Sequence, residues 1–192
     1  FEYASDCRIV TEPEAMEFLQ DRSGFIEGVV ISGGEPTLQK DLPDFCQRVK
    51  SMDFAVKLDT NGTNPAMIET LMQEQLIDYV AMDIKTDFQS YPAITKNEFH
   101  PEKIKQSVNL LLNGSLPYEF RTTCVKPYVD GTRIQRIGEL IQGADHLFLQ
   151  KFDHSHVSDL DYAGNRKAGF DDAEMADLRL RVQPYVADCR IR

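Results

Sequence analysis

The feature that most constrains the fold of this chain is a repeat of short apolar segments that each end in polar residues. These segments end near Ser32, Asp59, Asp83, Thr123 and Gln150, at intervals of 24 to 40 residues. Roughly this length accommodates one strand, one helix and their connections, and right-handed crossovers make such strands parallel neighbours. Five units are visible, whereas a complete (β/α)8 barrel has eight. The sequence therefore predicts an α/β fold built as a partial TIM-like barrel of parallel strands, with a doubly wound sheet as the alternative.

The apolar periods place the individual elements. We expect strands at 29–32, 54–59, 79–85, 118–125 and 146–152. Helices are expected between Thr11 and Gly24 and at about 38–51, 65–75, 100–112, 132–142 and 171–182. Residues 86–99 and 153–170 are predicted loops, and the last residues a short apolar tail. Because no linker or low-complexity segment interrupts this order, residues 1–192 are predicted to form a single domain.

Composition excludes several classes of function. The formal net charge of −10 argues against a nucleic-acid partner, which requires a basic face. No apolar run approaches membrane-spanning length, so we expect no membrane partner. Four widely spaced cysteines, Cys7, Cys46, Cys124 and Cys189, form neither a disulfide framework nor a zinc motif. This usage fits a reducing compartment, and a cytoplasmic location is expected.

The carboxyl ends of the predicted strands gather polar residues on one rim. Ser32-Gly33-Gly34-Glu35 forms a glycine turn after the first strand, and Asp59, Asp83 with Lys85, Arg121 and Gln150 follow the next four. Each has a simpler explanation: Glu35 could be solvated in a tight turn, Asp59 could cap a helix, Asp83 could pair with Lys85, and Arg121 could be structural. Successive strands that all carry such residues favour a ligand site.

The type of ligand is narrowed by what the rim contains. Neither a P-loop nor a GxGxxG motif is present. Three acids (Glu35, Asp59, Asp83) could hold a divalent cation, as in a metal-dependent barrel hydrolase. A zwitterionic ligand fits better, because Asp59 and Asp83 would accept from its amino group while Lys85, Arg121 or backbone amides would bind its carboxylate. The pair His154 and His156 lacks a neighbouring third ligand, so we assign no metal site.

Several of these motifs, taken in order, resemble a known family. The runs Gly33–Pro36, Lys57–Gly62 and Asp78–Lys85 are similar to those of radical S-adenosylmethionine proteins. Within that superfamily they resemble the glycyl-radical-enzyme activating group, near anaerobic ribonucleoside-triphosphate reductase activating proteins and pyruvate formate-lyase activating enzymes. The runs Glu119–Thr123 and Leu149–Phe152 fall where that group has its later strands, so the resemblance covers roughly residues 12–152.

This resemblance implies an activity and a set of roles. Such proteins use S-adenosylmethionine and a [4Fe-4S] cluster to form a 5′-deoxyadenosyl radical, which takes a hydrogen atom from a glycine of a glycyl radical enzyme. An anaerobic ribonucleotide reductase is one candidate partner. The backbone of Ser32, Gly33, Gly34 and Glu35 would bind the methionine amino group. The implied contacts to the rest of the cofactor come from Asp59, Thr60, Asn61, Asp83 and Lys85, with Arg121 and Thr123 nearby and Gln150 and Phe152 beside the adenine.

One departure from the family concerns the cluster. The family binds it through CxxxCxxC, a motif that this sequence does not contain. Since iron–sulfur ligation needs thiolates placed together, we assign no catalytic residue and expect the chain as given to be inactive alone. The expectation is a truncated chain that lacks the first strand and the cluster loop. A degenerate, non-catalytic module that binds S-adenosylmethionine is the alternative.

Overall fold

The computed structural model describes residues 8–95, 99–153 and 168–192. Within them a 6-stranded sheet runs in the order β1-β2-β3-β4-β5-β6, and every neighbouring pair is parallel. The strands are β1 (Gly28–Ile31), β2 (Ala55–Thr60), β3 (Tyr79–Asp83), β4 (Tyr118–Cys124), β5 (His146–Lys151) and β6 (Asp188–Ile191). A doubly wound sheet reverses its strand order at a switch point, so this sequential order identifies a partial barrel.

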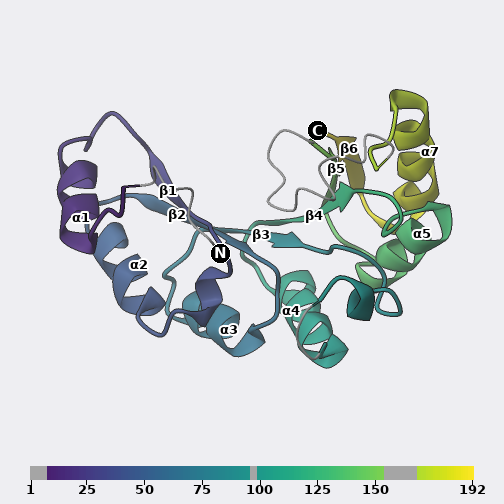
Figure 1. The fold of residues 1–192 in the computed structure, drawn as a ribbon. Helices are drawn as coiled ribbons and strands as arrows, with labels where there is room; N and C mark the ends of the chain where they lie inside the picture. The colour runs from purple at the N-terminus through teal and green to yellow at the C-terminus, as the bar shows by residue number, and fades with distance from the viewer. Residues whose placement is uncertain (1–7, 96–98, 154–167) are drawn as a thin grey trace.

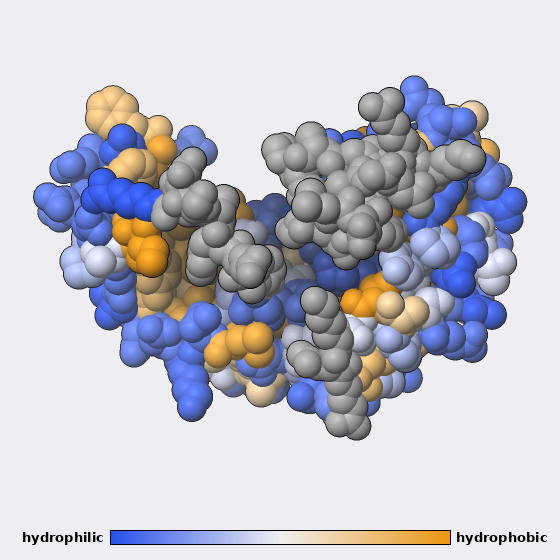
Figure 2. Space-filling model, in the orientation of Figure 1, coloured by the Kyte–Doolittle hydropathy of each residue, from blue (hydrophilic) through white to orange (hydrophobic). Residues whose placement is uncertain are grey.

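The helices follow the strands in regular alternation. They are α1 (Glu12–Gln20), α2 (Leu42–Lys50), α3 (Pro65–Gln73), α4 (Pro101–Asn113), α5 (Gly131–Leu140) and α7 (Asp172–Val182), with short 3-10 turns at Pro36–Leu38 (η1), Tyr91–Ala93 (η2) and Gln183–Tyr185 (η4). Figure 1 shows a curved sheet with α2 to α5 along its outer side and no described helix across its inner side. In the space-filling view the inner side is hollowed in the middle, and its floor is hydrophilic (Figure 2).

Because helices cover only one side of the sheet, the two faces of a strand carry different kinds of residue. In β2, Val56 and Leu58 are fully buried against the helices, whereas the alternating Lys57 and Asp59 are only partly buried. Alternation places neighbouring side chains on opposite faces, so the outer face forms the core and the inner face keeps the polar groups. The fully buried side chains of this core include Ile68, Leu71, Met82, Ile104, Leu111, Phe120, Ile134, Ile137 and Leu147.

The predicted order of elements is confirmed for the first five strands, but the prediction of an apolar tail is wrong. Residues Asp188–Ile191 form β6, which pairs with β5 in parallel. Two charged residues in a four-residue strand hide its period, and only Cys189 is buried in it. The helix expected at 38–51 is also split, since η1 ends at Leu38 and α2 begins at Leu42, one residue before Pro43. Proline is favoured at such a first turn.

None of the helices in the described ranges is both long enough and apolar enough to cross a bilayer.

The turn after β2 depends on Gly62. Its φ is +74°, and a Cβ at this position would lie 2.0 Å from Cε of Met82. The carbonyl of Gly62 accepts from Ser107 Oγ of α4 at 2.7 Å, and its N–H donates to Thr60 Oγ1 at 3.1 Å. This turn therefore fixes the end of β2 against both β3 and α4.

A Gly62→Ala substitution tests this account. We expect the positive φ to cost about 1 kcal/mol and the contact with Met82 about 1–3 kcal/mol more in the free energy of unfolding, measured by urea denaturation. Gly143→Ala is the matched control, because its φ is +90° and no atom lies within 4 Å of the added Cβ. Equal losses in the two variants would show that the Met82 contact contributes nothing.

Candidate functional site

The glycine turn after β1 is fastened by the side chain of Glu35. One carboxylate oxygen accepts from the hydroxyl of Thr60 at 2.7 Å and from Thr37, and the other accepts from the Asn61 N–H at 2.7 Å. Glu35 is thus not a solvated turn residue, because its carboxylate joins the carboxyl end of β1 to that of β2. Its side chain is occupied by these bonds, which leaves the backbone of the turn facing outward.

A groove of about 1210 Å³ runs beside this turn. Gly33 has a φ of +134° and nothing within 4 Å of the position a Cβ would take, so its backbone is exposed to the groove. Ser32 and Gly34 are exposed as well. The rest of the wall is mixed: Ala15, Leu42 and Phe45 of α1 and α2 line it together with polar side chains such as Glu12 and Asp41. The groove therefore combines exposed backbone with a wall of apolar and polar side chains.

Three charged side chains meet across β2, β3 and β4. Arg121 donates from Nε to Asp83 Oδ1 at 2.8 Å and from Nη1 to Asp59 Oδ2 at 2.9 Å. The side chain of Arg121 is 13% exposed, and those of Asp59 and Asp83 are 17% and 33% exposed. Burial alone would lower the pKa of Arg121, but the two carboxylates outweigh it and raise that pKa above its ordinary value. Arg121 therefore stays protonated between the two acids.

Asp59 keeps one oxygen without a hydrogen bond. Its Oδ1 is buried and, within the described residues, has no hydrogen-bond partner. The ammonium of Lys57 lies 3.8 Å away, an ion-pair distance that is too long for a hydrogen bond. A buried carboxylate oxygen without a donor is costly. This oxygen is thus an available acceptor for a ligand N–H or O–H.

The simpler alternative, in which Asp83 pairs with Lys85, is not what the structure shows. In the described part of the chain Asp83 pairs with Arg121 on the neighbouring strand, and the side chain of Lys85 is exposed. The Lys85 N–H donates to the hydroxyl of Tyr91 at 3.0 Å. Burial raises the pKa of Tyr91 to about 12, so this phenol remains neutral at ordinary pH. Tyr91, which sequence reasoning missed, holds the backbone that carries Lys85.

The remaining predicted residues lie along the same rim. Thr60 is buried beneath the turn, whereas Asn61 lines the groove. Thr123 on β4 is the register partner of Gln150 on β5, so the two lie side by side beyond Arg121. Phe152 follows β5 and is half-buried. The structure thus joins Glu35 to Thr60 and Asn61, and Arg121 to Asp59 and Asp83, by hydrogen bonds. It places the predicted residues of β5 at the far end of the rim.

A second polar cluster lies deeper on the inner face and was not predicted. Glu119, only 3% exposed, accepts from Lys57 Nζ, from the Tyr79 hydroxyl and from the guanidinium of Arg192 at 3.2–3.4 Å. The guanidinium of Arg192 also lies over the ring of Phe148, 3.4 Å from its centroid. The signal for Glu119 was its position two residues before Arg121, which puts both on one face of β4.

The loop after β3 is anchored to α5 through Asp87. Its side chain, 2% exposed, accepts from Arg136 Nη1 at 2.7 Å and from the Ser90 N–H at 3.1 Å. Burial alone would raise the pKa of Asp87, but the hydrogen bonds from Ser90 and Arg136 outweigh it and lower that pKa. This pairing fixes the loop that carries Tyr91.

The described cysteines do not form a cluster site. Cys46, Cys124 and Cys189 are buried on α2, β4 and β6. Burial raises the pKa of Cys124 to about 12 and that of Cys46 and Cys189 to about 11, so they stay thiols. In the described ranges no three histidine, cysteine or acidic residues are grouped as metal ligands. Cys7, His154 and His156 lie outside the described residues. The residues that the structure describes therefore do not fit a [4Fe-4S] cluster.

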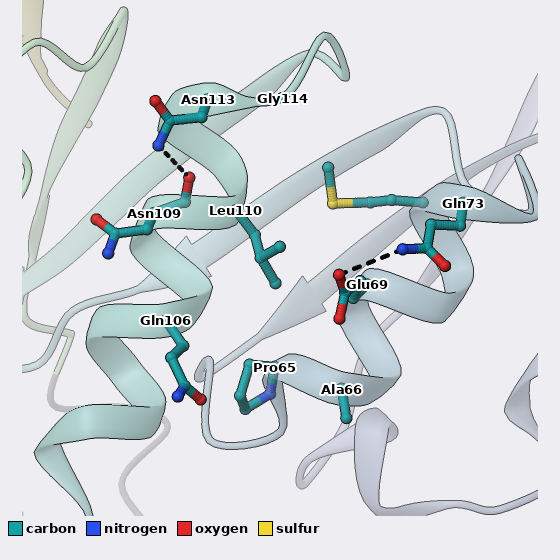
Figure 3. Close-up of a pocket in the computed structure, with 10 residues that line it drawn as sticks. Pro65, Ala66, Glu69, Gln73, Gln106, Asn109, Leu110, Asn113 and Gly114 are labelled. Carbon is teal, nitrogen blue, oxygen red and sulfur yellow. Dashed lines mark hydrogen bonds between the residues drawn. The ribbon is translucent and has the colours of Figure 1, made fainter.

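Another hollow, of about 590 Å³, lies on the outer side between α3 and α4 (Figure 3). Two of its polar side chains already donate to nearby groups: Gln73 to Glu69 and Asn113 to the carbonyl of Asn109. It holds none of the strand-end residues. The inner rim is therefore the candidate site.

Comparison with known proteins gives the family. The profile described as the radical SAM superfamily matches residues 5–137. A protein of Methanocaldococcus jannaschii, described as a glycyl-radical enzyme activating enzyme, is 37% identical over 143 residues, 72% of this chain and 60% of the relative. The chain thus spans less than two thirds of that relative's length.

Solved structures agree on the fold. A domain of pyruvate-formate lyase-activating enzyme from Bacteroides vulgatus superposes with a TM-score of 0.68 at 16% identity, covering 87% of this chain and 99% of that one. Streptococcus suis SuiB bound to the precursor peptide SuiA gives a TM-score of 0.72 at 14% identity, covering 100% of this chain and 44% of that one. Identities this low support the partial-barrel fold alone.

The role of Glu35 can be tested with Glu35→Gln. An amide in place of the carboxylate turns one acceptor into a donor, which then faces the N–H of Asn61 or that of Thr37. We expect a loss of about 1–3 kcal/mol in the free energy of unfolding, measured in urea. Glu27→Gln, at an exposed residue just before β1, is the control and should change little. A loss no greater than that of the control would mean that Glu35 does not fasten the two strand ends.

The anchoring of the rim loop predicts a pH dependence. Because the folded-state pKa of Asp87 is lowered, its contribution is present above the ordinary carboxyl pKa of about 4 and is lost as pH falls through the folded-state value. Asp87→Asn should therefore lower stability by about 1–3 kcal/mol near neutral pH. The difference from wild type should shrink towards about pH 3. Urea midpoints at several pH values measure this difference, with Asp21→Asn as the control. A difference that does not change with pH would contradict the lowered pKa of Asp87.

Proposed function

Since the chain belongs to the radical S-adenosylmethionine superfamily, we propose that the inner rim at the carboxyl ends of β1 to β5 binds S-adenosylmethionine. The observation that carries this proposal is the arrangement of Asp59 and Asp83 around Arg121, with a buried Asp59 oxygen left without a donor. Each of the two carboxylates keeps one oxygen that Arg121 does not bind. Such a site favours a ligand that brings a cation and several hydrogen-bond donors.

The shape of the ligand matches the sequence of groups along the rim. S-adenosylmethionine carries an ammonium and a carboxylate at one end, a sulfonium and a ribose in the middle, and an adenine at the other end. In our proposal the exposed backbone of Ser32, Gly33 and Gly34, held in place by Glu35, binds the methionine end. Asp59, Thr60, Asn61 and Asp83 bind the amino group and the ribose, and the exposed Lys85 takes the carboxylate. Thr123, Gln150 and Phe152 adjoin the adenine.

The bound molecule would supply the 5′-deoxyadenosyl group for the radical chemistry of the superfamily. We propose further that the whole protein activates a glycyl radical enzyme in the cytoplasm, with an anaerobic ribonucleotide reductase as one candidate. The support is the relative of 37% identity that carries this description. Because the described cysteines do not fit the cluster, the contribution assigned to these residues is binding and orientation of the cofactor.

The cysteine arrangement favours a second candidate, a module that binds S-adenosylmethionine without radical chemistry of its own. A metal-dependent hydrolase has less support. Hydrogen bonds from Thr37, Thr60 and Asn61 occupy the carboxylate of Glu35. Arg121 takes one oxygen from each of the other two acids. A wild-type chain that binds a divalent metal ion but not S-adenosylmethionine would favour the hydrolase.

Calorimetry with S-adenosylmethionine tests the proposed site. Asp59→Asn and Asp83→Asn should each weaken binding by about tenfold or more, because a charge-assisted hydrogen bond is lost. Asp188→Asn is the control, since Asp188 pairs with Arg190 at the start of β6, away from the rim. Wild-type affinity in both rim variants would refute the assignment of these acids.

A further inference from the structure

Arg121 is the one rim cation in the described residues that binds two of the predicted site acids, and this geometry points to a role other than ligand binding. Resting on the proposed function, we infer that Arg121 is a positioning residue: it fixes Asp59 and Asp83 so that Asp59 Oδ1 faces the ligand, and it does not bind the ligand carboxylate.

The sheet register makes this bridge possible. Arg121 and Asp83 are direct register partners on β4 and β3, so their bond joins adjacent strands. Asp59 lies on β2, beyond β3, and its register partner on β3 is Ala81. Side chains at positions 79, 81 and 83 point to one face, and Ala81 carries only a methyl group there. Arg121 can therefore cross β3 above a small residue and reach Asp59 Oδ2 at 2.9 Å.

The chemistry of the side chain suits two partners at once. A guanidinium presents donors on separate nitrogens in a fixed plane, so Nε serves Asp83 while Nη1 serves Asp59. A lysine ammonium is a single point on a flexible stem and does not hold two carboxylates in one plane. Arg121 is also only 13% exposed, so little of it is open to a ligand.

The acids beside Arg121 argue against its binding the carboxylate of the ligand. An anion approaching Arg121 would also meet the carboxylates of Asp59 and Asp83, which already take its Nη1 and Nε donors. Inside a partly buried site this repulsion is weakly screened. Within the described part of the chain, the exposed ammonium of Lys85 has no acid at ion-pair distance. Lys85 is therefore the better partner for the ligand carboxylate.

Two ligands that differ only in the carboxylate separate the two roles. The affinities of wild type, Arg121→Gln and Arg121→Lys are measured by calorimetry for S-adenosylmethionine and for decarboxylated S-adenosylmethionine. A positioning residue acts through Asp59 and Asp83, which face groups that both ligands share. Both variants should then lose about tenfold or more for both ligands, and by the same factor.

Arg190→Gln is the matched control. Arg190 lies in the same register row as Arg121, pairs with the single acid Asp188, and is exposed. The Arg190→Gln variant should leave both affinities unchanged, and circular dichroism should show that every variant is folded.

Three results would overturn the inference. A loss confined to S-adenosylmethionine would make Arg121 the carboxylate receptor. Full affinity in Arg121→Lys would show that charge alone suffices, and full affinity in Arg121→Gln would show that the bridge is irrelevant. If the wild-type chain binds neither ligand, the proposed function fails, and this inference fails with it. That outcome is distinct, because it is read from wild type alone.

Discussion

Everything at the candidate site depends on the sheet being covered by helices on one side. Parallel sheets are usually buried on both faces and read as continuous apolar runs. Here the strands alternate instead: Val56 and Leu58 join the core while Lys57 and Asp59 face inward. The inner face can therefore hold charged groups, and it satisfies them against one another. Three acids (Asp59, Asp83, Glu119) meet three cations (Lys57, Arg121, Arg192), so the network has no net charge.

The fold was largely predictable because its signal is local. Each of the first five strands combines an apolar run with a polar end, and the intervals match one βα unit. β6 lacks this signal, since half of its four residues are charged and it gains its place by pairing with β5. The break between η1 and α2 depends on chain geometry after Pro36, which a helical period does not report.

The site was predictable in its members but not in their partners. Strand ends identify Glu35, Asp59, Asp83 and Arg121 from the sequence, since parallel strands deliver them to one edge. Which acid pairs with Arg121 is set by register and by the size of Ala81, and both are properties of the assembled sheet. For the same reason the sequence could only offer the neighbouring Lys85 as an alternative partner for Asp83. Tyr91 and Glu119 escaped notice because their polar contacts join segments that are 6 residues apart for Tyr91 and 40 to 73 residues apart for Glu119.

The sequential strand order has a consequence for how such a domain can be extended. Among the described strands, β1 and β6 each have one neighbour, so the sheet offers a free row of backbone N–H and C=O groups at either side. A further strand could pair at either side without inserting between existing neighbours. The Arg121 bridge spans the interior strands β2 to β4. The barrel could therefore grow at its borders while the spacing of the polar groups at its centre stays unchanged.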